Sequence, residues 1–309
     1  MAQNMQELTR RMKSIQSTEH ITNAMRLVSA SKYKKAKNVF DRTSLQMDTV
    51  CGAIRKVIAA AQLQEQDLLA GKAESNAAWR TEQRKAGGKT ILIVISSSKG
   101  LCGGFNVNLM KEALAEAEGS PKENIEVFAI GSKGRDFFVH NGYTIIGEYD
   151  ESPEKITFEA AKAISGSIIE RYKSGKAERI LLVHTKYLNS LKQEPICECL
   201  MPLELEMTDA DITEGSEGGA GDVWETELEF SPSPREVLDY MIPKYFELTL
   251  FEAIIESAAC EHASRRTAME NATDNAREML EKLSLTYNRA RQAAITNELI
   301  EIVSGSEQT

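Results

Sequence analysis

Apolar residues recur at alternating steps of three and four along the first sixty residues of the chain. No Gly or Pro occurs before Gly52. A mean step of 3.5 is the coiled-coil period, which keeps one narrow apolar seam facing a partner helix. At about 1.5 Å per residue, fifty-odd residues form a helix of roughly 80 Å. The predicted seam consists of Met1, Met5, Leu8, Met12, Ile15, Ile21, Met25, Val28, Met47, Val50, Ile54, Val57 and Ala61.

A second long helix is predicted from Ser233 to the end of the chain. Ser233 is suited to the N-cap, Pro234 to the first helical position and Glu236 to closing a capping box. Pro243 follows within the early turns, where it could at most kink the helix, and the next Gly is Gly305. The seam here is Met241, Tyr245, Leu248, Ile255, Ala259, Met269, Ala276, Leu280, Leu283, Tyr287, Ala290 and Ala294, with polar Glu252, His262, Arg266 and Thr273 in the same register.

Neither helix can bury its whole stripe on a compact core of the size that the middle of the chain allows. We therefore expect each helix to cover the other, and an antiparallel pair follows if the chain leaves one helix, forms a middle domain and returns. Two broken helices folded into a bundle are the alternative, which the absence of Gly and Pro punctuation disfavours.

The middle of the chain alternates buried strand patterns with amphipathic helices. The run TILIVIS at residues 90–96 is a continuous apolar strand pattern, and residues 106–118 favour a helix. This alternation predicts a parallel α/β sheet. Further strands are predicted at 125–130, 143–147 and 179–185, helices at 133–140 and 156–173, and antiparallel edge strands at 197–200 and 224–230.

The predicted fold class is thus α/β, with a long antiparallel coiled coil of N- and C-terminal helices plus a Rossmann-like α/β foot domain. The Gly-bearing acidic segment within the foot has ten acids and no Lys or Arg, so we interpret its centre as a flexible surface loop. The predicted divisions are a coiled-coil helix at 1–61, a polar connector at 62–89, the foot domain at 90–232 with the acidic loop at 204–229, and a second coiled-coil helix at 233–309.

Charge is unevenly distributed along a chain whose formal net charge is −9. Residues 1–42 contain nine Lys and Arg against three acids, a local charge of +6. A basic arm on an acidic protein predicts an acidic partner surface near the N-terminus. Nucleic acid is the competing partner, but no aromatic interleaving or groove-reading motif supports it, and a solvated basic helix face is also possible.

Several other classes are disfavoured. No run approaches the roughly 18 apolar residues that a membrane helix needs, and the N-terminus has no secretory signal, so we expect a cytosolic protein. The five Cys form no CxxC pair and the four His are scattered, which argues for reduced thiols without a zinc site or a catalytic triad.

The glycine-rich segment SSSKGLCGGF at residues 96–105 lies between a strand and a helix, where dinucleotide-binding folds hold phosphate. Its spacing fits neither GxGxxG nor GxxxxGK[ST], and no His lies nearby to activate Ser98 or Cys102. A tight turn that needs backbone room is the better interpretation. The segment GSKGR at 131–135 has the same ambiguity.

Three segments together resemble the gamma subunit of the F-type ATP synthase, of the bacterial type. They are ITNAMRLVSASK at 21–32, KGLCGGFN at 99–106, and a C-terminal segment with ENATDNA at 270–276 and YNRARQAAITNELIEIV at 287–303. The resemblance covers the whole chain. The family usually has Asp-Arg where this chain has Ser98-Lys99, and Lys lacks the planar fork of Arg. Nothing matches the redox-regulatory insertion of the chloroplast form.

The resemblance implies a central rotor stalk that couples ion flow through a membrane c-ring to ATP synthesis or hydrolysis on the β subunits. It implies no catalytic residue, cofactor or metal in this chain, one copy per complex, and α, β, epsilon and c-ring partners at the cytoplasmic face of the cell membrane. Protons or sodium ions could drive the ring, because the membrane subunits set that choice.

The resemblance also implies particular contacts. By position, β-subunit contacts are expected at Met25, Lys32, Lys34, Lys35, Arg291, Gln292 and Thr296. Contacts with the apolar sleeve of the hexamer are expected at Ile295, Leu299, Ile302 and Val303.

Two other classes of function compete with this one. A coiled-coil scaffold would also have long seams, but it would not need the GLCGGFN turn or the RARQAAIT segment. A Rossmann-like nucleotide-binding enzyme would need a phosphate motif, which the sequence does not contain.

Overall fold

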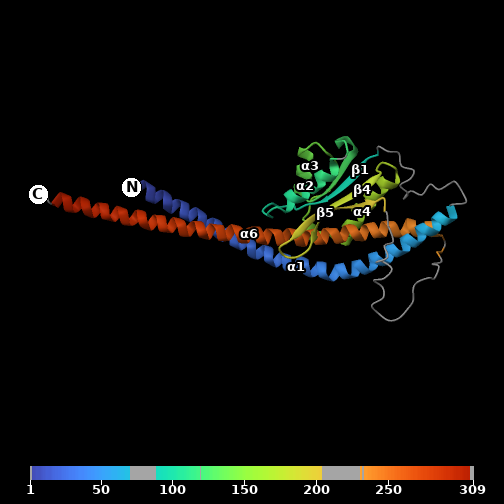
Figure 1. Cartoon of the computed structure of the whole chain (residues 1–309), viewed down its shortest axis with the longest axis horizontal. Helices are drawn as coiled ribbons and strands as arrows, with labels where there is room; N and C mark the ends of the chain where they lie inside the picture. Colours follow the sequence, from blue (N-terminus) through green and yellow to red (C-terminus); the bar gives the residue numbers. More distant parts are fainter. Residues whose placement is uncertain (1, 70–87, 119, 204–229, 232, 307–309) are drawn as a thin grey trace. The chain divides into compact units, whose positions relative to one another are not determined.

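The computed structural model describes residues 2–69, 88–118, 120–203, 230–231 and 233–306 of the chain. Along the sequence, one long helix precedes the strands of a five-stranded sheet and another follows them (Figure 1). The elements are α1 (Ala2–Leu69), β1 (Thr90–Ile95), α2 (Phe105–Ala117), η1 (Lys122–Asn124), β2 (Ile125–Ile130), α3 (Ser132–His140), β3 (Thr144–Tyr149), η2 (Pro153–Lys155), α4 (Phe158–Lys173), β4 (Arg179–Tyr187), β5 (Gln193–Met201) and α6 (Pro234–Ser306).

The sheet has the strand order β3-β2-β1-β4-β5. The β1–β2, β1–β4 and β2–β3 pairs are parallel, and β5 runs antiparallel to β4. The parallel α/β sheet and the antiparallel strand at 197–200 are therefore confirmed. The predicted strand at 224–230 and the acidic loop at 204–229 lie outside the described residues, apart from Phe230, which is not in a strand.

Two compact units make up the chain. The first comprises Met1–Lys34, Leu101–Gly103 and His262–Thr309, and the second comprises Lys35–Gly100 and Gly104–Glu261. Helix α1 runs to Leu69, so the first eight residues of the predicted 62–89 connector are helical, and residues 70–87 lie outside the described residues.

In the second unit, both faces of the sheet are covered. Successive residues of β1 point to opposite faces, as the pleat requires. Leu92 and Val94 pack in a cluster with buried residues of α2 and α3. Ile91, Ile93 and Ile95 pack in another cluster with α4, α1 and the first turns of α6. Residues 253–261 of α6 are all buried.

The seam of α1 in this unit differs in part from the prediction. Met47, Ile54 and Ala61 are buried as expected. The register between them passes through Cys51 and Ile58, whereas Val50 is 45% exposed. The seam keeps its 3.5-residue spacing. It passes through Cys51, although Val50 beside it is the larger apolar side chain.

The start of α6 follows the predicted capping pattern. The backbone N–H of Glu236 donates to Ser233 Oγ at 3.3 Å, and Ser233 Oγ lies 3.4 Å from a carboxylate oxygen of Glu236. Pro234 is the first residue of the helix. Helix α6 continues through Pro243 and spans 73 residues, so the continuous-helix prediction is confirmed.

An ion cluster around a buried carboxylate links strand β2 to helix α4 and to the residue that precedes β1. Glu126 on β2 is 4% exposed and pairs with Lys89 at 2.7 Å and with the Arg171 guanidinium of α4. Burial alone would raise the pKa of Glu126, but the hydrogen bonds and charges of the two cations lower it below its ordinary value. The carboxylate thus remains ionised inside the fold.

We expect Glu126→Gln to lower the free energy of unfolding by about 1–3 kcal/mol, because it removes two charge-assisted hydrogen bonds while keeping the side-chain shape. Because the folded pKa is lowered, this stabilisation is present above the ordinary carboxyl range and is lost as the pH falls through the folded value. Urea unfolding of the full chain at pH 7 and pH 4 measures both effects. Glu123→Gln, at an exposed position, is the control, and equal losses in the two variants would contradict the assignment.

Candidate functional site

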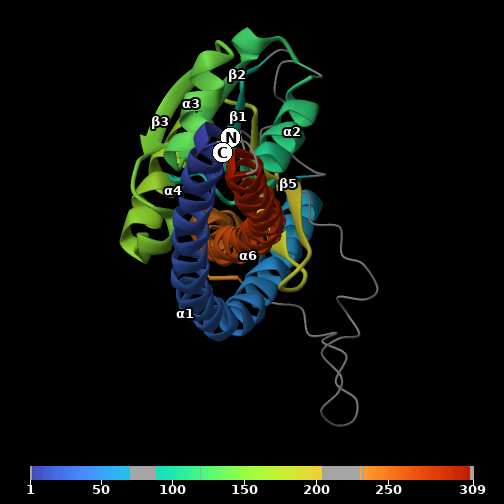
Figure 2. The same ribbon diagram turned by 90° about the vertical axis from the view of Figure 1, so that its left-hand side faces the viewer.

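The helical parts of the first unit pair in antiparallel orientation. The hydroxyl oxygens of Thr22 and Thr273 are 2.9 Å apart. Arg277 Nε donates to Glu19 Oε1 at 3.1 Å. Partner numbers on α6 rise as those on α1 fall, which is the antiparallel sense, and Figures 1 and 2 both show the two segments side by side. The predicted antiparallel pairing is therefore confirmed within this unit.

The α1 seam of this unit passes through polar residues. From Ile15 the register continues to Glu19, Thr22, Arg26 and Ser29, all of them partly or fully buried. Ser29 is only 2% exposed. These positions preserve the steps of three and four because the period of a paired helix is fixed by geometry, whatever the polarity of the side chains.

Two of the predicted seam residues face outward instead. Ile21 is 58% exposed and Val28 is 57% exposed, because the seam runs through the neighbouring Thr22 and Ser29. The same steps of four and three join Ile21, Met25, Val28 and Lys32 on α1. We call these four residues the outer stripe.

The outer stripe combines apolar and basic side chains. Met25 is half-buried and Lys32 is exposed. Leu27 is also 57% exposed, but it lies on a different flank of α1 from the outer stripe. Neighbouring exposed apolar side chains on one helix face are typical of a surface that another protein covers. Lys34, at the end of this unit, and Lys35, which begins the second unit, are exposed as well.

Near its C-terminal end, α6 exposes the other predicted contact residues. Arg291, Gln292 and Thr296 are exposed, and Thr296 Oγ1 donates to the backbone carbonyl of Gln292 at 2.9 Å. Ile295 is 48% exposed and Leu299 is 58% exposed. Ile302 and Val303 lie on the helix, but their side chains are outside the described residues.

The turn Leu101–Gly103 belongs to this unit and lies against α6. Gly103 has φ +57°, and a Cβ there would lie 3.5 Å from the Cβ of Ala268. Leu101 also has a positive φ of 63° and is 62% exposed, whereas Cys102 is buried. A non-Gly residue with this backbone conformation is uncommon. The tight-turn interpretation of the glycines is confirmed at Gly103.

In the second unit, α6 contacts the sheet at the place where dinucleotide-binding folds hold their ligand. In such folds the ligand binds outside the carboxyl ends of the strands at the switch point, which lies between β1 and β4 here. At the end of β4, the N–H of Thr185 donates to Ser257 Oγ and that of Tyr187 donates to Glu256 Oε1, at 3.3 and 2.8 Å. Side chains of α6 therefore use the groups that a ligand would bind.

The ends of β1 and β2 are joined to each other. Ser96 Oγ accepts the N–H of Gly134 at 2.8 Å, and a Cβ at Gly131 would lie 2.2 Å from the carbonyl oxygen of Ser96. The second glycine-rich segment thus needs its glycines for close packing against β1.

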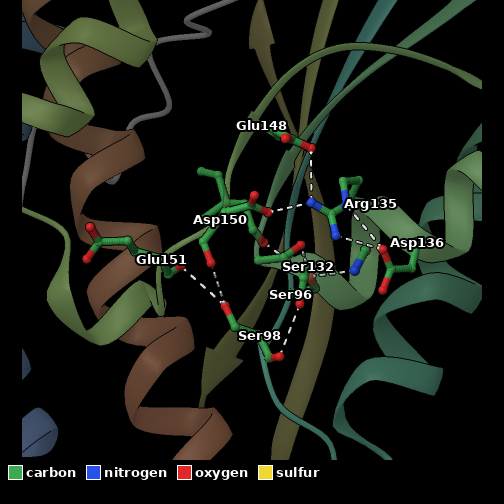
Figure 3. A network of polar contacts seen from close by, with 11 residues as sticks. Ser96, Ser98, Ser132, Arg135, Asp136, Glu148, Asp150 and Glu151 are labelled. Atoms are coloured by element: carbon green, nitrogen blue, oxygen red, sulfur yellow. Dashed lines mark hydrogen bonds and ion pairs between the residues drawn. The ribbon is translucent and has the colours of Figure 1, made fainter.

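Figure 3 shows the polar network beside this contact. Ser98 Oγ donates to the carbonyl of Glu151 at 3.2 Å, and Arg135 pairs with Asp150 at 2.7 Å and with Glu148 at 3.3 Å. At this edge of the sheet, Ser98 therefore bonds to backbone, and Arg135 supplies ion pairs.

The described residues contain no group of three or more His, Cys, Asp or Glu arranged to hold a metal ion. The five cysteines, all within the described residues, form no disulfide, and burial raises the pKa of Cys197 to about 12. Within the described part of the chain, no helix is both long and apolar enough to cross a membrane.

Solved structures define the class of fold. The chain is similar to the central stalk of the Tetrahymena thermophila mitochondrial ATP synthase, with a TM-score of 0.58 and 20% identity over 82% of this chain and 99% of that one. It is also similar to a rotor chain of the Euglena gracilis mitochondrial ATP synthase, with a TM-score of 0.64 and 18% identity over 96% and 100% of the two chains. The fold is therefore that of ATP synthase central stalks.

Sequence relatives define the family. The family model described as ATP synthase matches residues 4–308. The ATP synthase gamma chain of Alkaliphilus metalliredigens is 38% identical over 99% of both chains. The sodium-ion-specific gamma chain of Acetobacterium woodii is 35% identical, again over 99% of both. The chain belongs to the ATP synthase gamma chain family.

We expect neighbouring substitutions to separate the seam from the outer stripe. Ser29→Asp introduces a charge at a buried position and should lower the free energy of unfolding by about 1–3 kcal/mol. Val28→Asp, one residue away on an exposed face, should change it by no more than about 0.5 kcal/mol. Urea unfolding of the two full-length variants measures both values. Similar losses would mean that Val28 is not on an outer face.

Proposed function

We propose that this chain is the central rotor stalk of an F-type ATP synthase. It couples ion flow through a membrane c-ring to ATP synthesis or hydrolysis by rotating inside a hexamer of α and β subunits. The observation that carries the proposal is the outer stripe on a pair of antiparallel helices, in a chain that belongs to the gamma chain family. A structural coiled coil would have no need to keep apolar side chains on its outer face.

The proposed mechanism is mechanical. A single shaft inside a threefold shell presents a different face to each β subunit. Each catalytic site is biased toward the state whose contacts with the shaft are most favourable, because a partner shifts an equilibrium only by its differential affinity for the two states. The chain itself contributes no catalytic residue. The chemistry belongs to the β subunits.

Met25, Lys32, Lys34 and Lys35 are the proposed β-subunit contacts on α1. The outer stripe adds Ile21 and Val28 to this surface, since they share its spacing and are more than half exposed. The excess of basic residues over residues 1–42 favours an acidic region on the β subunits. At the other end of the chain, the proposed contacts are Arg291, Gln292 and Thr296 with a β subunit, and Ile295, Leu299, Ile302 and Val303 with the hexamer sleeve.

The remaining partners are the epsilon subunit and the c-ring, with one copy of this chain per complex and no nucleic acid. The protein is then a peripheral subunit at the cytoplasmic face of the cell membrane. The absence of a membrane-spanning helix among the described residues fits attachment through other subunits.

Purification of the native complex tests the assignment. We expect α and β subunits to co-purify with the full chain in a ratio of three of each to one. A free monomer that binds nucleotide would support the enzyme alternative, and a complex that lacks both subunits would support a coiled-coil scaffold.

Substitution at Met25 tests the stripe. We expect Met25→Lys to lower ATP-driven ion pumping several-fold, while the assembled complex and its ATP hydrolysis are largely retained. The substitution adds a positive charge to the outer stripe, in addition to that of Lys32, and so changes the contact with the β subunit without disturbing the seam. Pumping into inverted membrane vesicles, normalised to hydrolysis, is the measurement. Val139→Lys, at an exposed apolar position on α3, is the matched control. Unchanged pumping in the Met25 variant would rule out the contact.

A further inference from the structure

Four carboxylates meet in the second unit where α1, α6 and the β4–β5 hairpin come together. Arg55 on α1 donates to the hydroxyl of Tyr245 on α6 at 2.9 and 2.6 Å, which fixes the antiparallel register of the two helices. Two turns away, that register brings Asp48 opposite Glu252. Glu256 lies one turn further along α6, and Glu198 lies on β5. We call Asp48, Glu198, Glu252, Glu256 and the enclosed His184 the acidic junction.

His184 is at the centre of the acidic junction. Its side chain is 4% exposed. Nε2 lies 3.7 Å from Glu198 Oε2, and Nδ1 lies 3.7 Å from Glu256 Oε2. Neither ring nitrogen has a hydrogen-bond partner within the described residues. A ring with an N–H on each nitrogen can donate in both directions, whereas a neutral ring has a single donor for two carboxylates.

Glu256 connects the helix to the sheet. Its Oε1 accepts the N–H of Tyr187 at 2.8 Å, while its other oxygen faces His184. The contact between α6 and the β4–β5 hairpin therefore depends on a carboxylate that has a second carboxylate, Glu252, on the next turn of the same helix.

The charges around the acidic junction do not balance. Four carboxylates are faced by the cations Arg55 and Lys186, which leaves −2 when every acid is ionised and His184 is neutral. The Cys51 thiol and the Tyr245 hydroxyl also face this region, and burial raises the pKa of the Cys51 thiol. One bound proton would halve this excess negative charge, and two would bring the cluster to neutrality.

Glu252 is the group most strongly affected by this imbalance. Burial, followed by the charges of Asp48, Glu256 and Glu198, raises its pKa to about 7. Burial also raises the pKa of Glu256, whereas His184 beside it lowers the pKa of Glu198. The pKa of Glu252 thus lies within the physiological pH range.

We propose that the acidic junction is a proton-dependent contact, which holds the β4–β5 hairpin and α1 against α6 when it is protonated and loosens when it loses that proton. Loss of the proton leaves carboxylates on three elements repelling one another in a partly buried site. This inference does not depend on the proposed rotor function, since it concerns only contacts within the second unit.

The direction of the effect follows from linkage. Because the pKa of Glu252 is raised from 4.5 to about 7, the folded chain binds a proton that the unfolded chain releases between these values. Its contribution to stability is therefore fully present below the lower value and is lost as the pH rises through about 7.

Thermal unfolding of the full chain between pH 5.5 and 8.5 at constant ionic strength tests this direction. We expect the Tm of the unmodified chain to fall as the pH rises from 6 to 8. Glu252→Gln should flatten that fall and raise the Tm at pH 8 by about 2–4 °C. Glu159→Gln, at an exposed position on α4, should follow the unmodified chain. A fall in Glu252→Gln parallel to that of the unmodified chain would overturn the proposal.

Hydrogen exchange of the unmodified full chain tests the location without any variant. After correction for the intrinsic rate, we expect protection of the amides of Thr185 and Tyr187 to decrease roughly tenfold between pH 6 and pH 8, while amides of β1 and β2 keep theirs. His184→Gln should lose this protection already at pH 6, and His140→Gln, at an exposed histidine, should not. Equal loss across the whole sheet, or no loss at the β4–β5 hairpin, would refute a local contact.

Discussion

The two terminal helices are too long to be covered by one side of a small sheet, and this requirement shapes the rest of the structure. Each unit meets it in the same way. In the first, α1 and α6 pair through Thr22 and Thr273; in the second, they pair through Arg55 and Tyr245. A second contact gives each pairing its antiparallel sense, namely Glu19 with Arg277 in the first unit and Cys51 with Thr249 in the second. The remaining side chains of α1 and α6 are then sorted by whether they face the partner helix, the sheet or the surroundings.

The polar part of the seam has a physical role of its own. Leucine-like side chains can slip past one another by a heptad at little cost, whereas a buried polar pair is satisfied in one register only. The Thr22–Thr273 contact is a pair of this kind, and the Glu19–Arg277 ion pair supports the same register, with Arg277 57% exposed. They give up some burial of apolar surface, and they fix which residues of α1 form the outer stripe.

Sequence periodicity predicted most of the fold because buried strands and long unbroken helices have strong local signals. The apolar run at 90–96 and the capping residues Ser233 and Glu236 are examples. It misassigned Ile21, Val28 and Val50 because their apolar character was taken as a sign of burial. Ser29 and Cys51, which are buried, and Thr22, which is partly buried, have weaker or opposite signals. Alternating steps of four and three, followed from Ile15, would have found the seam as far as Ser29, whereas continued strictly they lead to Val50 instead of Cys51.

The residues of the candidate site were predicted from the family resemblance rather than from periodicity. Met25 and Lys32 came from the resemblance to a family, and their common face with Ile21 and Val28 emerged once the seam register was known. The acidic junction could not be foreseen, since it joins residues 48, 184, 198, 252 and 256 from four elements. Only the register of the α1–α6 pair and of the β4–β5 hairpin brings them together.

The strand ends of the sheet have one more consequence. In dinucleotide-binding folds those backbone groups bind a diffusing ligand, and here Ser257 and Glu256 of α6 bind to β4 in its stead. Helix α6 is therefore an intramolecular ligand of its own sheet. A tethered ligand has a high effective concentration, so individually weak contacts are sufficient to keep it bound. Exchange for an outside ligand would require the helix to leave, so that specificity at this position is determined by chain connectivity.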